Sequence, residues 1–264
     1  MLIGHISDLH VRPEGQLYQG VVDSNAMLDD AVRHLNALDP RPDVVLIGGD
    51  IVDHGQPDEY GAARARLAQL AMPFLVIPGN HDHRENFRAA FADHDYLARE
   101  GPLHWCVDTY PVRLIGLDSC VPGKHHGDID AAGLQWLRTT LAADPSKPTL
   151  VLLHHPPFVS GIPYMDTYRY MNPDPLAAVL RDFGCVERVL CGHVHRTMLR
   201  RWAGTVVASC PSTTTEIALQ FAPDAKPQSW LTPPACMLHR WDPAHGMLSH
   251  LSTIGRFPGP YGFA

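Results

Sequence analysis

The sequence contains no apolar run of the roughly 20 residues that a membrane-spanning helix needs. It also lacks a basic region ahead of its first apolar residues, which a secretory signal peptide would show. Instead, Met1–Ile6 lead straight into an acidic, histidine-bearing segment. We therefore expect no membrane partner and a cytoplasmic location. The 264 residues, 45% of them apolar and 19% charged, have the composition of an ordinary globular domain.

Positive charge is in short supply, because 21 Lys and Arg face 28 Asp and Glu and leave a formal net charge of -7. Nucleic-acid binding needs basic patches, so we expect no nucleic acid as a stable partner. A phosphate ester substrate is not excluded, since bound metal ions can outweigh the local protein charge. The six cysteines show no C-x-x-C pairing, and we expect buried thiols rather than a disulfide framework.

Apolar runs of strand length alternate with helix-like segments, which is typical of an α/β protein with largely parallel strands. The runs predict strands over Leu2–Ile6, Val44–Ile47, Phe74–Ile77, Leu150–Leu153 and Val186–Leu190. The segments between them predict helices over Asn25–Leu38, Glu59–Leu70, Ala131–Leu141 and Leu176–Phe183. After residue 197 the pattern predicts a proline-rich ordered loop, Phe221–Pro234, and strands over Thr205–Ala208, Cys236–Trp241 and Met247–Leu251.

Histidine is abundant, at 17 residues, and much of it lies in polar clusters that follow the predicted strands. The clusters read S-D-L-H, G-G-D-I-V-D, G-N-H-D, H-H-P-P and G-H-V-H. Turns are polar in any protein, which accounts for the Gly, Pro, Asp and Asn but not for the histidines. Because functional loops gather beyond the carboxyl ends of the strands in open α/β sheets, we expect these clusters to converge.

The clusters supply seven candidate metal ligands: Asp8, His10, Asp50, Asn80, His154, His193 and His195. In D-x-H and H-x-H one residue separates the two ligands, so at a strand end both can point to one side. Two glycines before Asp50 allow a tight turn. Carboxylate, imidazole and amide donors suit Fe, Mn, Zn or Co. Seven donors are too many for one ion, so we expect two divalent metal ions that share a carboxylate.

The ordered set of motifs resembles that of the calcineurin-like metallophosphoesterase superfamily, and in particular its bacterial glycerophosphodiesterases and class III cyclic-nucleotide phosphodiesterases. The late stretch P-P-A-C-M-L-H-R extends the likeness over nearly the whole chain. The resemblance implies a four-layer α/β/β/α sandwich with a loop- and strand-rich C-terminal segment. We expect one domain over residues 1–264, in which 197–264 complete the second sheet and are candidates for a cap or a homo-oligomer contact.

The resemblance also implies roles for individual residues. One metal would be held by Asp8, His10, Asp50 and His195, and the other by Asp50, Asn80, His154 and His193, with Asp50 bridging. A hydroxide held by the metals would attack phosphorus in line. His81 would contact the phosphate or protonate the leaving oxygen, and Asp82 would hold His81 in place.

Two departures from the family pattern bear on the substrate. Protein phosphatases of this superfamily carry arginines where this chain has His54 and Pro78, and Glu where it has Asp82. A diester monoanion needs less positive charge than a monoester dianion, so this favours a phosphodiesterase. Threonines at 213–215 stand where a glycerophosphodiesterase would carry a substrate-contacting histidine, so both glycerophosphodiesters and 3′,5′-cyclic nucleotides are candidate substrates.

Several alternatives remain open at this point. The same site would serve a phosphomonoesterase or a nuclease, whereas an inactive scaffold would be expected to have lost ligands. Asp53 is expected to orient a ligand or to cap the next helix, and His155 could replace His154. We expect His83, His125 and His126 to be solvated loop residues. Five residues could either line a substrate cleft or pack in the ordinary way: Tyr18, Tyr164, Met165, Tyr168 and Tyr170.

Overall fold

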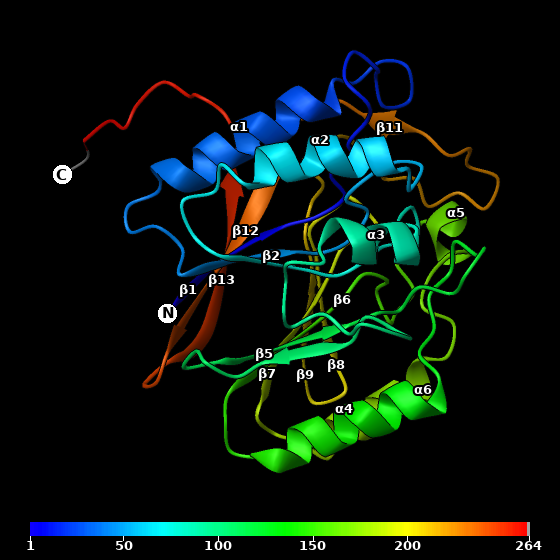
Figure 1. Cartoon of the computed structure of the whole chain (residues 1–264), viewed down its shortest axis with the longest axis vertical. Helices are drawn as coiled ribbons and strands as arrows, with labels where there is room; N and C mark the ends of the chain where they lie inside the picture. Colours follow the sequence, from blue (N-terminus) through cyan, green and yellow to red (C-terminus); the bar gives the residue numbers. More distant parts are fainter. Residues whose placement is uncertain (263–264) are drawn as a thin grey trace.

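Two mixed β-sheets pack face to face in the computed structural model, which describes residues 1–262, and helices cover the outer face of each sheet (Figure 1). From the top of that view to the bottom, the layers run helix, sheet, sheet, helix. The expected four-layer α/β/β/α sandwich is confirmed.

The first sheet contains strands from both ends of the chain, in the order β13 (Gly246–Thr253), β12 (Ala235–Asp242), β1 (Leu2–Ile6), β2 (Val44–Ile47) and β3 (Phe74–Val76). The last three of these strands are parallel, whereas β12 pairs antiparallel with β1. The hairpin β12–β13 thereby covers the edge that β1 would otherwise expose.

The second sheet has the order β4 (Trp105–Val107), β5 (Arg113–Leu117), β6 (Thr149–Leu153), β7 (Val186–Cys191), β9 (Thr205–Ser209) and β8 (Met198–Trp202). Its central strands β5, β6, β7 and β9 are parallel. Residues 197–264 were expected to complete the second sheet. Within the described residues, β8 and β9 extend that sheet, but β12 and β13 extend the first, because the edge of β1 offers them a register of antiparallel partners.

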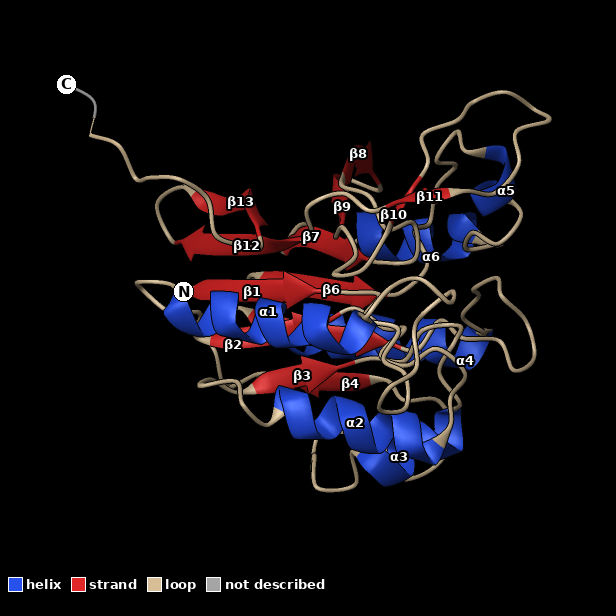
Figure 2. Cartoon of the chain, turned by 90° about the horizontal axis from the view of Figure 1, so that it is seen from above, coloured by secondary structure: helices blue, strands red, loops and turns tan. Residues whose placement is uncertain are grey.

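The helices follow the layers. The first sheet is covered by α1 (Ser24–Ala37), α2 (Pro57–Leu67) and α3 (Arg84–Ala90), and the second by α4 (Ala131–Ala143) and α6 (Pro173–Arg181). The single turn α5 (Pro163–Asp166) lies among the loops. Figure 2 shows most loops gathered at the end of the sheets toward which β1 points. None of the helices within 1–262 is long and apolar enough to span a membrane.

Local chemistry explains where the helices begin. Asp23 and Asp130 cap α1 and α4 by accepting a backbone N–H three residues ahead. A capping box formed by Gln56 and Glu59 starts α2. Both α2 and α6 begin at a proline, earlier than the apolar pattern predicts, because proline is tolerated in the first turn.

Sequence reasoning missed several elements, namely β4, β5, β8, α3, α5 and two short strands, β10 (Glu216–Ile217) and β11 (Ser229–Trp230). In β5 the apolar pattern is interrupted by Arg113, which is buried because its guanidinium donates to Thr149 Oγ1 and to two backbone carbonyls. Helix α3 buries a single residue, Phe87, so it carries no apolar periodicity. Proline-rich 221–234 is a loop except for β11.

Successive side chains of the central strands point to opposite faces of the sheet, so each strand packs against both neighbouring layers. On β6, Leu150 and Leu152 belong to the apolar cluster between the sheets, whereas Val151 and Leu153 belong to the cluster under α4 and α6. A strand buried on both faces needs such an unbroken apolar run. All six cysteines are free thiols, three buried and three half-buried, as expected.

Trp105 joins the two sheets at one edge. Its indole Nε1 donates a hydrogen bond of 2.8 Å to the carbonyl of Val76, at the end of β3. Gly116 lies opposite Trp105 in the ladder between β4 and β5, and a Cβ there would come within 2.2 Å of the indole. Gly116 is therefore required by the position of the tryptophan.

Gly116→Ala is expected to destabilise the fold by about 1–3 kcal/mol, because the added methyl displaces a packed ring and weakens its buried hydrogen bond. The free energy of unfolding would be measured in urea. Gly61→Ala is the control, since a Cβ at Gly61 on α2 meets no heavy atom within 4 Å and alanine favours the helix. Equal urea midpoints for the two variants would contradict this account of the sheet contact.

Candidate metal centre

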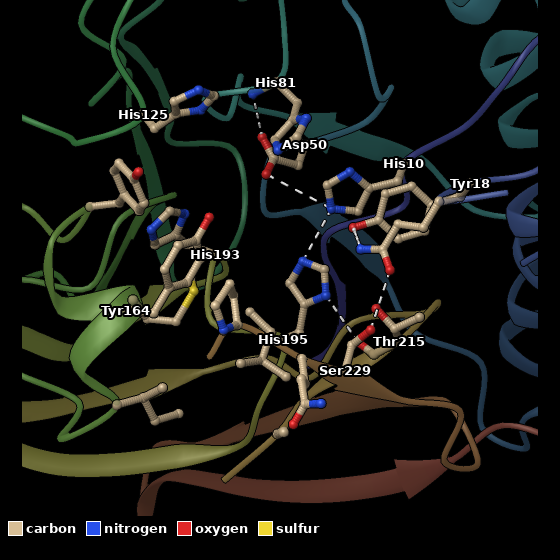
Figure 3. Close-up of a pocket in the computed structure, with 18 of the residues that line it drawn as sticks. His10, Tyr18, Asp50, His81, His125, Tyr164, His193, His195, Thr215 and Ser229 are labelled. Carbon is tan, nitrogen blue, oxygen red and sulfur yellow. Dashed lines mark hydrogen bonds and ion pairs between the residues drawn. The ribbon is translucent and has the colours of Figure 1, made fainter. Parts of the chain in front are cut away.

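The five polar clusters of the sequence converge, as expected, beyond the carboxyl ends of the parallel strands. Three of them follow β1, β2 and β3 of the first sheet, and two follow β6 and β7 of the second. Figure 3 shows His10, Asp50, His193 and His195 turned toward one another around a cavity. The site therefore spans the two sheets and exists only when they are packed together.

Backbone strain is concentrated at this site. Five of the seven predicted ligands have positive φ angles, between 45° and 71°: Asp8, His10, Asp50, His193 and His195. For a non-glycine residue this left-handed conformation costs about 1–2 kcal/mol. The pairs D-x-H and H-x-H were expected to share a side through the pleat of a strand. The structure corrects this reason, because β1 ends at Ile6 and both pairs lie in left-handed turns past their strands.

The first group of ligand atoms comes from Asp8, His10 and His195, which lie within 4.8 Å of one another. His195 Nε2 is 3.1 Å from His10 Nε2 and 3.4 Å from Asp8 Oδ1. The other ring nitrogen of His195 donates to the carbonyl of Thr215 at 2.9 Å, which directs Nε2 inward. Asp50 Oδ2 lies 3.9 Å from His10 Nε2, at the edge of the group.

The second group is built around His154, whose Nε2 lies 3.2 Å from the same Asp50 oxygen. His154 Nδ1 donates to the carbonyl of Gly48 at 2.7 Å and so holds the ring. His193 offers a nitrogen within 4.8 Å of His154. Asp50 thus touches both groups, which is the position that a bridging carboxylate needs.

Two buried atoms test whether these residues fit a metal. Asn80 Oδ1 and His193 Nε2 are inaccessible to solvent and have no hydrogen-bond partner within residues 1–262. An unpaired polar atom of this kind costs about 1–3 kcal/mol when buried. An amide oxygen and a neutral imidazole nitrogen are both ligands for divalent ions. The donor set therefore fits divalent metal ions.

The charges in the centre are mutually dependent. Burial alone would raise the pKa of Asp50, but the imidazoles of His154, His81 and His10 hold it well below its usual value. Burial by itself would lower the pKa of His154. The neighbouring carboxylate of Asp50 counteracts this effect and raises that pKa to about 9. The lowered pKa keeps Asp50 anionic, the charge state in which a carboxylate can bind a metal ion.

His81 lies beside the ligands without joining either group of donors. Its backbone N–H donates to Asp50 Oδ1 at 2.8 Å, and its ring Nδ1 donates to the carbonyl of Asp53 at 2.8 Å. The carboxylate of Asp53 is 3.5 Å from the same ring and 3.7 Å from the ring of His10. The backbone carbonyl of Asp53 therefore holds the ring of His81, whereas its carboxylate is too far from the ring of His10 for a hydrogen bond. Gln56, not Asp53, caps α2.

Asp82 was expected to hold His81, and the structure corrects this. Its carboxylate accepts hydrogen bonds from Gly79 N at 2.8 Å, Ile51 N at 3.2 Å and Tyr60 Oη at 2.9 Å. Consecutive side chains in a tight turn point in different directions, so Asp82 faces the backbone beneath the site. It ties the loop after β2 to the turn after β3. Burial and the nearby Asp50 raise the pKa of Asp82 to about 7.

The adjacent pair His154-His155 left His155 open as the ligand in place of His154, and a ring nitrogen of His155 does lie within 4.8 Å of ligand atoms of His154 and His193. Both of its ring nitrogens are already used. Nδ1 accepts from Ser119 Oγ at 2.8 Å, and Nε2 donates to the carbonyl of His125 at 3.1 Å. These bonds favour His154 as the ligand and give His155 a structural role in holding the loop of His125.

The centre opens into a cavity of about 770 Å³. Of the five residues that could line a cleft or pack, four line this cavity: Tyr18, Tyr164, Met165 and Tyr168. The fifth, Tyr170, is fully buried in the core. Tyr18 stacks on the ring of His10, with centroids 4.4 Å apart.

His125 was expected to be a solvated loop residue, and it is exposed but not remote. Its Nδ1 is 3.5 Å from the amide nitrogen of Asn80, and its ring lies 6.0 Å from that of His81 and 5.6 Å from that of Tyr168. His83 instead caps α3 by accepting from Asn86 N. No signal in the sequence separated His125 from the other loop histidines, because its contact with Asn80 joins residues that are 45 positions apart in the sequence.

Comparison with known proteins agrees with this geometry. A model of the calcineurin-like phosphoesterase family matches residues 1–197. All of this chain aligns, at 36% identity, with 97% of a probable glycerophosphodiester phosphodiesterase, GpdQ, of Arcobacter nitrofigilis. At 34% identity, 79% of this chain aligns with 69% of a probable cyclic nucleotide phosphodiesterase of Rhodococcus erythropolis. A dimetal phosphatase from Danio rerio has the same fold, with a TM-score of 0.64 at 15% identity over 97% of this chain and 99% of that one.

The purified protein is expected to bind two divalent ions per chain, because one carboxylate connects two sets of donors. Elemental analysis after metal loading and gel filtration would count them. Asp50→Asn should lower the affinity for both ions, whereas the exposed His250→Ala on β13 should change neither. A stoichiometry of one ion under metal-replete conditions would exclude the binuclear arrangement.

Proposed function

The chain belongs to the calcineurin-like phosphoesterase family, and from that premise we propose that it is a phosphodiesterase that uses two divalent metal ions to hydrolyse small diesters, either glycerophosphodiesters or 3′,5′-cyclic nucleotides. The observation that carries the proposal is the position of Asp50, which touches His10 of one ligand group and His154 of the other. Asn80 and His193, with their unpaired buried donor atoms, complete the second group.

The protein's own residues support hydrolysis in defined ways. When bound, divalent ions at this position offset the phosphate charge and lower the pKa of the attacking water. Asp8, His10 and His195 would hold one ion, and Asp50 would serve both. Six of the seven candidate ligands are buried, and the low local dielectric strengthens their electrostatic contacts.

His81 is the group best placed to act on the leaving oxygen. The bond from its Nδ1 to the carbonyl of Asp53 leaves Nε2 as the only ring atom able to reach a substrate in the cavity. We assign His81 the transfer of a proton to the departing alkoxide, or a hydrogen bond to the phosphate. Asp82 acts only by shaping the turn that carries Asn80 and His81.

Charge around the centre favours a diester over a monoester. His54 stands where phosphatases of the family carry an arginine, and the structure places a different arginine, Arg12, against its ring. The Arg12 guanidinium donates to Glu59 at 2.7 Å and lies 3.2 Å from the carboxylate of Asp53. Its charge is therefore offset by protein carboxylates, and little remains for a phosphate dianion.

Diesters should be hydrolysed with a kcat/KM at least about tenfold above that for monoesters, the factor that roughly 1.4 kcal/mol of missing charge contact would produce. Bis(4-nitrophenyl) phosphate and 4-nitrophenyl phosphate would be compared at fixed metal concentration. His54→Arg should narrow the ratio by adding positive charge, whereas His54→Gln should not. The phosphatase alternative wins if the unaltered protein prefers the monoester.

Asn80 and His81 are adjacent, but their substitution should have different effects on metal binding and on kcat. Asn80→Ala should weaken binding of one ion, and excess metal should restore part of the activity, because a neutral amide is a weak ligand. His81→Ala should leave two ions in place and lower kcat by roughly 10²–10⁴-fold.

The loss in His81→Ala should be smaller for a 4-nitrophenolate leaving group, which departs without protonation, than for an alkoxide such as glycerol. Metal content and kcat would be measured on the same preparations. Equal losses of kcat on both substrates would show that His81 is not the acid. Loss of a metal ion from His81→Ala would show that His81, rather than Asn80, is the ligand in the G-N-H-D motif.

A further inference from the structure

The centre opens into the larger cavity, and one of its candidate ligands, Asn80, also lines a second cavity. Beside the cavity of about 770 Å³, a second of about 490 Å³ is lined by the turn around Gly123 and by the start of α3. Asn80 and His125 line both cavities. A phosphate bound at Asn80 would therefore have one cavity on each side, and a diester has two ester arms to place.

Both cavities carry polar as well as apolar side chains. The larger one includes Tyr164 and Tyr168, whose rings meet edge to face with centroids 5.4 Å apart. The smaller one combines Val121 and Pro122 with several charged side chains, so each charge there has to be traced to its partner.

Most charges in the smaller cavity are already compensated. Arg84 donates to Asp118 Oδ2 at 2.7 Å and to the carbonyl of Cys120 at 2.9 Å. Glu85 lies 3.3 Å from the guanidinium of Arg88. Asp82 is fully buried and accepts three hydrogen bonds. None of these groups is free to meet a charged ligand without losing a partner.

Lys124 is the exception. It ends a turn in which its N–H donates to the carbonyl of Val121 at 3.0 Å and Gly123 adopts φ +71°, the pattern of a type II turn with Pro122 at its second position. The turn presents Lys124 at the wall of the smaller cavity, next to His125. Its side chain is exposed, and its ammonium forms no ion pair or side-chain hydrogen bond with residues 1–262.

We propose that the smaller cavity binds the second ester arm of the substrate and, through Lys124, favours an arm that ends in a carboxylate or phosphate. This inference rests on the proposed phosphodiesterase function and narrows it to open-chain diesters with one anionic arm. A 3′,5′-cyclic nucleotide places both ester oxygens on one ribose, so it has no separate second arm for the smaller cavity.

Two 4-nitrophenyl phosphodiesters test this, one with a 2-carboxyethyl second arm and one with a propyl arm of similar size. The unaltered enzyme should prefer the carboxyethyl ester through a lower KM. Lys124→Ala should reduce that preference roughly two- to fivefold, as expected for a solvated charge pair, and Lys124→Glu should reverse it. Both variants should change the kcat/KM for the propyl ester much less than the kcat/KM for the carboxyethyl ester.

Lys226→Ala is the matched control, because Lys226 is an exposed lysine that lines the larger cavity. It should leave the preference intact, and added salt should weaken the preference in the unaltered enzyme. A preference that survives Lys124→Glu, or one that Lys226→Ala abolishes, would overturn the proposal while leaving the diesterase function standing. If neither ester is hydrolysed by metal-loaded enzyme, the proposed function itself fails, and this inference with it.

Discussion

The contact between Asp50 and the histidines of both sheets is the interaction on which the rest of the site depends. Asp50 follows β2 in the first sheet, yet its Oδ2 lies 3.2 Å from His154, which follows β6 in the second. Its other oxygen accepts the N–H of His81. The backbone at Gly79 and Gly49 has to come very close to Asp50 and His154 for these contacts to form. A Cβ on Gly79 would lie 2.2 Å from that oxygen, and one on Gly49 would lie 2.6 Å from the ring of His154. Glycine is required at both positions because no side chain fits between the carboxylate and its partners.

Such an arrangement stores unfavourable free energy that the scaffold has to offset. Five ligands hold left-handed backbone conformations, and donor atoms of Asn80 and His193 are buried without partners among the described residues. The parallel strands beneath them are buried on both faces, and the sheet contact at Trp105 and the hairpin β12–β13 close the edges. A rigid scaffold of this kind keeps the ligands in place before metal binds, so that binding an ion relieves the strain of unpaired polar atoms rather than having to order the chain.

The proposed substrate preference follows from the distribution of charge outside the candidate ligands. Arg12 could have met a phosphate dianion, but Asp53 and Glu59 already neutralise it. Lys124 forms no ion pair within residues 1–262 and lines the smaller cavity, which shares Asn80 with the larger one. Little positive charge is therefore left beside the centre for a terminal phosphate, whereas Lys124 is free to meet an anionic group farther along the substrate. Both features favour a phosphate that carries two arms.

The sequence by itself determined the five parallel strands that carry the clusters, the clusters and the seven candidate ligands, because the apolar runs and the histidine-rich turns are local patterns. It did not determine β5, where Arg113 interrupts the apolar run. Tertiary structure decided which neighbour of each candidate acts with it. Asp82 is adjacent to His81 but faces the backbone of Gly79 and Ile51, while Asp53, 28 residues earlier, holds the ring. His10 and His195 meet across 185 residues of sequence. Local patterns carry no information about such pairings, since turn geometry and the packing of one sheet against the other set the direction of each side chain.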